Sequence, residues 1–409
     1  MRHWWRGRGP MYSSRALPFS RADRSRIRHP MVRTSQRSAP PHRPPVPRPR
    51  SRPMTIDIPN RALFGPGPSN VSQEVLDATA LPCIGHLDPV FGQIMDEVKE
   101  MLRQVFRTRN AMTFPISAPA SLAMEAALVN LLEPGNTAIV GINGVFGGRM
   151  ADIVTRAGAH LVTVENDWGT PVDADAMKEA IAANPDAKLV AFVHAETSTG
   201  TCTDPGPICA AASEAGMLSI VDTVTGLIGS NVDVDGWGAD VVYSGTQKCL
   251  SVPPGLAPIT FSDRAIEVIK TRETKVQSWF CDLNLVLGYW SGDGARSYHH
   301  TAPVNAIYGL HAGLKAVLDE GLDAARARHE EAHRRLDQGL ARLGLDFLVD
   351  APHRLPQLNV VKVPEGVDEA AVRARLLKDK NIEIGAGLGP LAGKVWRLGL
   401  MGENARPER

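Results

Sequence analysis

The stretch Leu218-Ser-Ile-Val-Asp222 is an apolar run that ends in an acid, and Val241-Val-Tyr-Ser-Gly-Thr-Gln-Lys248 is a second apolar run that leads to a lysine. Short apolar runs of this kind, bounded by polar and glycine residues, predict two buried strands. In a parallel sheet, ligands bind in the crevice beyond the carboxyl ends of the strands. We therefore expect Asp222 and Lys248 to face one pocket.

An acid and a lysine in one pocket are what pyridoxal phosphate requires of a protein. The lysine amine condenses with the aldehyde of the cofactor, and the acid keeps the pyridine nitrogen protonated so that the ring accepts electrons. Taken alone, Lys248 would be an ordinary surface lysine and Asp222 a cap of the next turn. Their spacing, with the Pro253-Pro-Gly255 turn after the lysine, favours the cofactor hypothesis.

Strand and helix patterns alternate on both sides of this pair. Further strands are expected at residues 137–140, 160–164 and 189–193, and helices at residues 91–106, 121–132, 173–184 and 206–216. Ser121 is a candidate N-cap for the second of these helices. The alternation predicts an α/β fold, in which a mostly parallel sheet is sandwiched by helices.

A smaller α+β domain is expected after this region. A long helical pattern runs from residue 304 to residue 343, and short strands at 359–363 and 396–400 flank a helix at 369–378. We divide the chain into an extension at 1–53, an arm and large cofactor-binding domain at 54–320, and a small C-terminal domain at 321–409.

The first 53 residues differ in composition from the rest of the chain. They contain 14 of the 45 basic residues and only one of the 44 acids, and they are rich in proline. Such a segment cannot bury enough apolar surface to fold, so we expect disorder. A basic arm, an Arg-rich transit peptide and translated sequence upstream of the true start are three interpretations, and the abrupt change at Met54 favours the last.

From Met54 onward the chain carries 31 basic and 43 acidic residues, a net charge of −12. This balance gives no electrostatic basis for binding nucleic acid. The longest apolar stretch, residues 111–132, is interrupted by two prolines and an acid and does not predict a membrane span. The odd number of cysteines, without a C-x-x-C pair or a secretory signal, indicates a cytoplasmic protein.

Four other features suit such a cofactor site. The loop Ser117-Ala-Pro-Ala-Ser121 leads into a helix whose first N–H groups can bind an anion, although a simple helix cap is the alternative. Phe146, in a Gly-rich loop after a strand, can stack on a ring. Arg397 emerges from an apolar strand and suits a substrate carboxylate. The two histidines of Tyr298-His-His-Thr301 lack further ligands at suitable spacing, so no metal site is predicted.

The chain resembles the class V aminotransferases of fold type I, and within them the alanine/serine–glyoxylate aminotransferase group, from about residue 63 to residue 402. The resemblance is carried by several motifs in the right order. They are Leu63-Phe-Gly-Pro-Gly-Pro-Ser-Asn70, Gln93-Ile-Met-Asp-Glu97, Glu125-Ala-Ala-Leu-Val-Asn-Leu-Leu-Glu-Pro-Gly135, His194-Ala-Glu-Thr-Ser-Thr-Gly200, Val221-Asp222, Tyr243-Ser-Gly-Thr-Gln-Lys248, Tyr298-His-His-Thr301 and Arg397-Leu-Gly-Leu.

The resemblance implies a role for each matching position. Lys248 would condense with pyridoxal phosphate and Asp222 would pair with its pyridinium, while Arg397 and Gly67 would belong to the substrate site. The remaining cofactor contacts would come from Ala120, Ser121, Phe146, Thr197 and Gln247, and from Tyr298 and Thr301 of a neighbouring subunit. This last pair implies a homodimer with active sites at the interface.

Two departures from the family pattern stand out. Relatives have a Gly-rich Ser-Gly-Ser/Thr-Gly phosphate loop where this chain has Ser117-Ala-Pro-Ala-Ser121. Because proline supplies no N–H, Ser121 should carry more of the phosphate contact. Relatives also continue beyond Gly402 with a helix that closes the small domain, so this domain is expected to be truncated.

The expected activity is a ping-pong transamination from a small amino acid, serine or alanine, to glyoxylate or a similar 2-oxo acid. Lys248 would act as general base at the α carbon, and Arg397 would orient the substrate carboxylate. One alternative is a lyase of the same fold, such as a cysteine desulfurase, for which Cys249 and Cys281 are candidates. A second alternative is a non-catalytic paralogue that binds the cofactor.

Overall fold

The computed structural model describes residues 56–291 and 296–408. Pro59–Arg409 cluster as one compact unit. The extension expected to be disordered, residues 1–53, lies outside the described residues. The division of the remaining chain at residue 320 stays a prediction.

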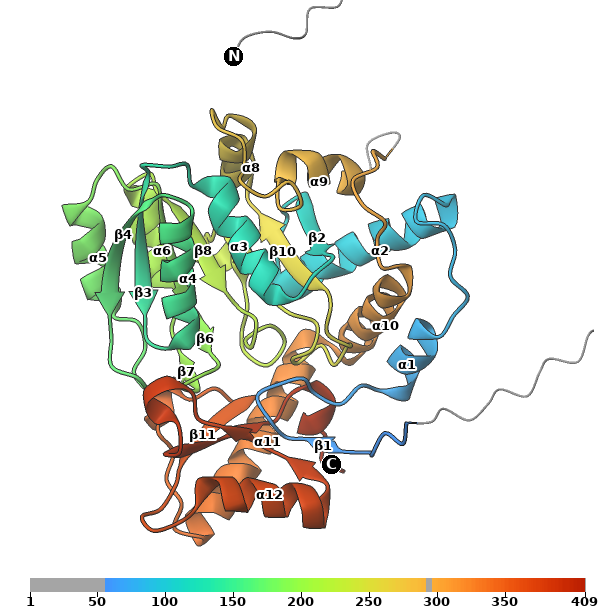
Figure 1. Ribbon diagram of the computed structural model, residues 1–409, viewed down its shortest axis with the longest axis vertical. Helices are drawn as coiled ribbons and strands as arrows, with labels where there is room; N and C mark the ends of the chain where they lie inside the picture. Colours follow the sequence, from blue (N-terminus) through green and yellow to red (C-terminus); the bar gives the residue numbers. More distant parts are fainter. Residues whose placement is uncertain (1–55, 292–295, 409) are drawn as a thin grey trace, which may run out of the picture. The chain divides into compact units, whose positions relative to one another are not determined.

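A seven-stranded sheet forms the centre of this unit, with six strands parallel and β10 antiparallel to its neighbours (Figure 1). Its strands, in spatial order, are β2 (Met112–Ile116), β10 (Ala257–Phe261), β9 (Val241–Tyr243), β8 (Leu218–Asp222), β5 (Leu189–Val193), β3 (Thr137–Ile142) and β4 (His160–Glu165). The predicted mostly parallel α/β fold is confirmed. The five strands expected from the sequence are all present.

Strands β2 and β10 were not predicted, because each contains a proline. Proline removes a donor from a sheet ladder and usually argues against a central strand. Pro115 lies in β2, which is an edge strand and pairs only with β10. Pro258 lies opposite Pro115 and beyond the residues of β10 that pair with β9. Both prolines are therefore at positions where the sheet does not need the backbone N–H that proline lacks.

Helices cover both faces of the sheet (Figure 1). On one face, α3 (Ala120–Leu131) packs against α4 (Val145–Arg156); on the other, α5 (Ala174–Ala183) packs against α6 (Gly206–Glu214). Their side chains and those of the strands form one large buried apolar core. The remaining helices of this part are α1 (Gln73–Thr79), α2 (Pro89–Phe106), α7 (Val234–Trp237), α8 (Asp263–Lys270) and α9 (Leu283–Trp290).

The prediction that Ser121 caps α3 is wrong. The helix begins at Ala120, and its N-cap is Pro119, which is extended (φ −65°, ψ 158°) and makes no side-chain cap hydrogen bond. The fixed φ of proline suits the residue that leads into a helix, so the N-cap lies two residues earlier than expected. Ser121 is consequently in the first turn, where its N–H has no intrahelical acceptor.

A second, smaller sheet forms towards the C-terminus, beyond two long helices. The predicted helical region from residue 304 is divided at Gly321 (φ 88°) into α10 (Val304–Glu320) and α11 (Leu322–Arg342). The small sheet has the order β11 (Leu358–Lys362), β14 (Val395–Gly399) and β13 (Gly385–Ala386), and α12 (Glu369–Lys380) lies beside it. It has a core of its own around Phe347, Val361 and Trp396.

Two short strand pairs and three 3-10 turns complete the described fold. β1 (Ala62–Leu63) pairs in parallel with β12 (Ile382–Glu383), so the start of the compact unit is bound to the C-terminal part. β6 (Ala195–Glu196) pairs with β7 (Thr201–Cys202) just after β5. The 3-10 turns are η1 (Ala351–His353), η2 (Gly389–Leu391) and η3 (Gly402–Ala405).

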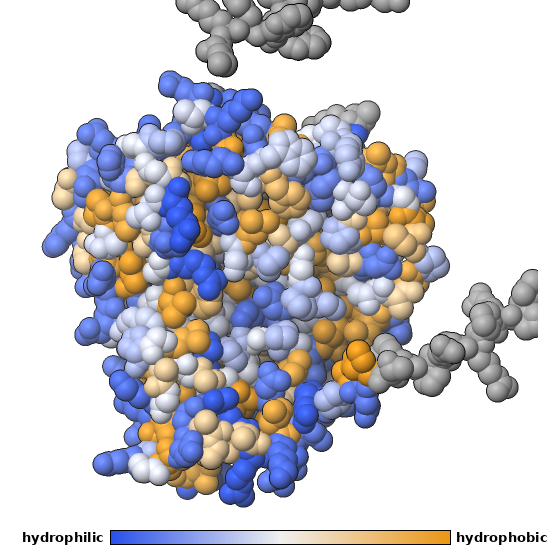
Figure 2. All heavy atoms as spheres, viewed as in Figure 1, coloured by the Kyte–Doolittle hydropathy of each residue, from blue (hydrophilic) through white to orange (hydrophobic). Residues whose placement is uncertain are grey.

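The surface in the same view mixes hydrophilic and hydrophobic side chains (Figure 2). Among the helices that the structure describes, none has both the length and the apolar character needed to cross a membrane.

Replacing Ile220 by alanine should destabilise the fold, because this side chain lies in the middle of β8 and is fully buried. We expect the free energy of unfolding to fall by about 2–5 kcal/mol, the cost of a large-to-small change in a packed core. Denaturant unfolding of the full chain, at one fixed cofactor concentration, measures this change. As a control, Leu343→Ala at a position that is 73% exposed should change stability by less than about 0.5 kcal/mol. A loss below about 1 kcal/mol for Ile220→Ala would contradict the assignment of β8 to the core.

Candidate active site

The carboxyl ends of four neighbouring parallel strands open onto one cavity. Its walls include each residue predicted to contact the cofactor from within one subunit. These residues are Ala120, Ser121, Phe146, Thr197, Asp222, Gln247 and Lys248. The parallel arrangement of β3, β5, β8 and β9 brings most of them together, because the loop that follows each strand begins at the same edge of the sheet. Ala120 and Ser121 follow β2, which runs in the same direction as these strands.

Asp222 ends β8 and is buried at the floor of this cavity. Its Oδ2 accepts a hydrogen bond from the Tyr243 hydroxyl at 2.8 Å, and its Oδ1 accepts one from the Val224 N–H at 2.8 Å. Burial raises the pKa of Asp222 to about 7, although both hydrogen bonds oppose the rise. The two bonds fix the direction of the carboxyl group, and a cationic partner in the cavity would favour its charged form.

Lys248 is buried in the loop after β9, as the sequence predicted. Its Nζ donates a hydrogen bond to the carbonyl oxygen of Pro66. Burial lowers the pKa of Lys248 to about 8, and the positive charge of Arg397 acts in the same direction. The amine is therefore much more readily deprotonated than that of a surface lysine.

Gly67, predicted to belong to the substrate site, lies directly against Lys248. A Cβ at position 67 would be 2.7 Å from Lys248 Nζ, and its φ of 104° also disfavours any other residue. The small size of Gly67 leaves the lysine amine room in the cavity.

Glu196 was not predicted, although it lies inside the motif His194-Ala-Glu-Thr-Ser-Thr-Gly200. Its side chain is fully buried, and burial raises its pKa. One carboxyl oxygen accepts hydrogen bonds from the N–H and hydroxyl of Ser198, and the other accepts one from the Phe146 N–H at 3.2 Å. Glu196 thereby caps α4, whose own N-cap is Gly144, and fixes the backbone of Phe146. An acid just after a buried strand is the signal that could have identified it.

Arg397 lies in β14 and is buried, and within the described part of the chain its partners are backbone carbonyl oxygens and not an acid. Its Nε donates to the carbonyl oxygen of Ala386 at 2.7 Å, and its Nη1 donates to that of Thr197 at 3.2 Å. Burial lowers the pKa of Arg397 to about 10, and the charge of Glu196 opposes this shift. The contact with Thr197, whose side chain lines the cavity, places the guanidinium next to the cofactor site.

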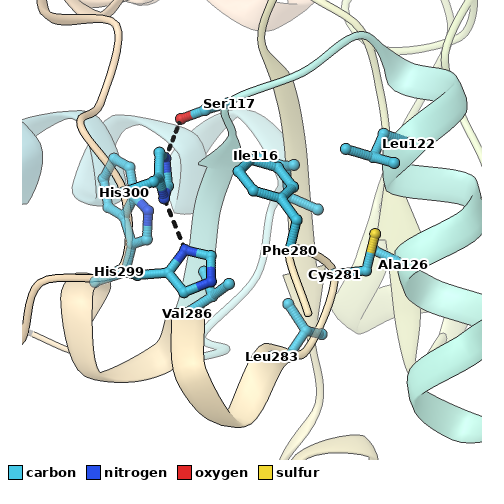
Figure 3. A pocket seen from close by; sticks show the side chains of 11 residues that line it. Ile116, Ser117, Leu122, Ala126, Phe280, Cys281, Leu283, Val286, His299 and His300 are labelled. Carbon is cyan, nitrogen blue, oxygen red and sulfur yellow. Dashed lines mark hydrogen bonds between the residues drawn. The ribbon is translucent and has the colours of Figure 1, made fainter. Parts of the chain in front are cut away.

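Tyr298 and Thr301 are not brought into the cavity that contains Lys248. Both side chains are exposed. Between them, His299 and His300 share a hydrogen bond of 2.8 Å, and His300 Nε2 lies 2.7 Å from the hydroxyl of Ser117 (Figure 3). The segment is thereby attached to the loop that precedes α3. Across residues 56–291 and 296–408, no group of three or more acidic, histidine or cysteine side chains is arranged to hold a metal ion.

The residues of the cavity fit pyridoxal phosphate. A lysine of lowered pKa and a hydrogen-bonded acid line the same cavity, with an aromatic ring held at its wall by Glu196. Gln247 Oε1 is buried and has no hydrogen-bond partner among the described residues, which leaves it available to a ligand. The first turn of α3 offers N–H groups to the phosphate, as helix N-termini often do.

Comparisons with known proteins agree with this fit. The family profile described as Aminotransferase class-V matches residues 62–395. An alanine–glyoxylate aminotransferase of Drosophila melanogaster is 40% identical over 89% of this chain and 93% of its own length. A (S)-ureidoglycine–glyoxylate transaminase of Bacillus subtilis is 37% identical over 86% of this chain and 88% of its own length. The crystal structure of an alanine–glyoxylate aminotransferase from Nostoc sp. has a TM-score of 0.85 and 43% identity, and the match covers 87% of this chain and 93% of that one. The chain therefore belongs to the class V aminotransferases, a family of enzymes that depend on pyridoxal phosphate.

Proposed function

We propose that this aminotransferase transfers the amino group of a small amino acid, alanine or serine, to glyoxylate. The observation that carries the proposal is the burial of Lys248 and Asp222 in one cavity, with the Arg397 guanidinium beside it. The relatives named for glyoxylate transamination cover most of the chain at 37–43% identity, which supports glyoxylate as the acceptor.

The residues of the cavity divide the work of such a reaction. When bound, pyridoxal phosphate withdraws electrons from the bonds at the α carbon of the amino acid. Lys248, whose pKa of about 8 leaves part of its amine neutral near physiological pH, takes up the proton of that carbon as a general base. Asp222 balances positive charge at the cavity floor, and Arg397 orients the substrate carboxylate through paired hydrogen bonds.

A lyase of the cysteine-desulfurase type is less well supported. That chemistry requires a reactive thiolate beside the substrate. Cys249 is buried, and burial raises its pKa to about 12. Cys281 is also buried and has a pKa raised by burial. In the described part of the chain, the walls of the Lys248 cavity contain no cysteine.

We also propose that the enzyme is a homodimer in which Tyr298 and Thr301 complete the site of the neighbouring subunit. Exposed aromatic side chains gather at this segment: Tyr298 is 65% exposed, and Trp279, which is 61% exposed, stacks on His299 with ring centroids 4.5 Å apart. Exposed aromatic clusters of this kind are typical of protein interfaces. The hydrogen bond from this segment to Ser117 lies just before the helix that would face the phosphate.

We propose that the protein is cytoplasmic because its cysteines are not paired in disulfides. All five are unpaired thiols, and a reducing compartment is where such thiols persist.

Lys248→Ala should lower transamination by at least about 100-fold, because no other amine lines the cavity within the described residues to act as general base. Mixing the enzyme with alanine and following conversion of pyridoxal phosphate to pyridoxamine phosphate measures the first half-reaction, and adding glyoxylate measures the second. Lys270→Ala, at an exposed position of α8, is the matched control.

Three results would contradict this proposal. Conversion of the cofactor by Lys248→Ala at the wild-type rate would show that Lys248 is not the general base. Release of sulfide from cysteine, without pyridoxamine phosphate, would indicate the lyase. Cofactor absorbance that no amino acid changes would indicate a non-catalytic paralogue.

The rate at which cofactor-free enzyme takes up pyridoxal phosphate should rise with pH around a midpoint of about 8. Only the neutral amine attacks the aldehyde, and the lowered pKa of Lys248 makes that form available well below the pH at which a surface lysine loses its proton. Stopped-flow absorbance from about pH 6 to about pH 10 measures it. Arg397→Met should raise the midpoint, because Arg397 lowers the pKa of Lys248. A wild-type midpoint near that of a surface lysine would be inconsistent with the buried position.

Mixing Lys248→Ala with Tyr298→Ala subunits should restore activity that neither variant has alone. If each site takes its lysine from one subunit and its tyrosine from the other, random exchange regenerates about a quarter of the wild-type sites. The measurement is transamination after the two variants are mixed and allowed to exchange subunits, with each variant alone as control. If mass spectrometry demonstrates subunit exchange but no transamination activity is recovered, Tyr298 does not contribute to the active site of the neighbouring subunit.

A further inference from the structure

The phosphate end of the cofactor cavity has few hydrogen-bond donors. Pro119 has no N–H and no side-chain donor, and the N–H of Leu122 is already bonded to the Pro119 carbonyl oxygen. The hydroxyl of Ser117 is bonded to His300. The loop therefore offers a phosphate only the N–H groups of Ala120 and Ser121 and the Ser121 hydroxyl. A phosphate dianion has three strongly accepting oxygens, so it needs donors beyond those of this loop.

Arg149 lies beside these donors. It is located on α4, one turn after Phe146, and its side chain lines the same cavity. Its Nη1 donates a hydrogen bond to the Ser121 hydroxyl at 3.0 Å. Its guanidinium carbon lies 4.8 Å from the centre of the Phe146 ring. The two contacts hold the cation between the first turn of α3 and the aromatic wall of the cavity.

The charge of Arg149 is not balanced by an acid. In the described part of the chain, Arg149 forms no ion pair. By contrast, Arg156, about two turns further along α4, is paired with Asp152 at 2.7 Å. A half-buried guanidinium without a carboxylate partner is well suited to an anionic ligand, because its planar donor groups match the oxygens of a phosphate. The field of Arg149 also reaches the cavity floor, where it opposes the rise in the pKa of Tyr243 that burial causes.

We propose that Arg149 binds the phosphate group of the cofactor and supplies the charge and donors that the Pro119-containing loop lacks. The hydrogen bond to Ser121 holds the guanidinium at the first turn of α3 before the cofactor arrives. The contact with Phe146 keeps the side chain against the cavity wall, so that little rotational freedom is lost on binding.

The test compares two ligands that differ only in the phosphate group: pyridoxal phosphate and pyridoxal. The full chain, freed of cofactor, is titrated with each, and the absorbance of the lysine-bound aldehyde is followed without any amino acid present. For Arg149→Gln, we expect the Kd of pyridoxal phosphate to rise about 10- to 100-fold, in line with the loss of a charge-assisted contact, and that of pyridoxal to change by less than about twofold. Arg156→Gln, a neighbouring arginine that is paired with Asp152, should change neither.

Two results would overturn the proposal. An equal loss of affinity for both ligands would mean that Arg149 acts only by supporting Phe146. Unchanged affinity for both ligands would mean that Arg149 does not contact the cofactor. Arg149→Lys, which keeps the charge but not the planar donors, should show an intermediate, phosphate-dependent loss and serves if the glutamine variant does not fold. Because no amino donor is used, failure of this test leaves the transamination proposal untouched.

Discussion

The parallel register of β5, β8 and β9 is the constraint on which the active site depends. It places Asp222 opposite Val193 on one side and opposite Tyr243 on the other. The Tyr243 hydroxyl can then reach the Asp222 carboxyl, and the loop after Tyr243 carries Lys248 to the same edge of the sheet. A shift of one residue in either pairing would turn the acid to the opposite face of the sheet, because side chains alternate along a strand.

Four buried charged groups surround this edge, two acids and two bases. Burial raises the pKa values of Asp222 and Glu196 and lowers those of Lys248 and Arg397. Burial destabilises the charged form of each of these groups. Each group also makes hydrogen bonds, which offset part of the free energy that its charge loses on burial. As a result, the pKa values of Asp222 and Lys248, about 7 and about 8, lie close to neutral pH. This is the range in which a general base such as Lys248 moves a proton at a substrate carbon efficiently.

The sequence predicted the parts of this arrangement that depend on strand ends. The five strands with clean apolar patterns and the residues that follow them were located correctly, because the position of a strand end largely determines where its next polar residue lies. Strands β2 and β10 were missed because their prolines are tolerated only through edge position and register, which are properties of the assembled sheet. The N-cap of α3 was misplaced by two residues, since Pro119 rather than Ser121 precedes the helix. Glu196 could not be recognised as a cap of α4, because Phe146, whose N–H donates a hydrogen bond to it at the start of that helix, lies 50 residues away in the chain.

The segment from Ala62 to Ser69 mechanically connects the lysine to the small sheet. At one end, Ala62 and Leu63 pair with β12, and the Phe64 carbonyl oxygen accepts a hydrogen bond from the N–H of Gly399, at the end of β14. At the other, Pro66 accepts the hydrogen bond from Lys248, and the Ser69 N–H bonds to the carbonyl oxygen of Gln247. Arg397 lies in β14 itself, two residues before Gly399. The strand that carries the arginine and the loop that carries the lysine are thus tied to one short piece of chain, so the distance between the two cations is set by the backbone as well as by their side chains.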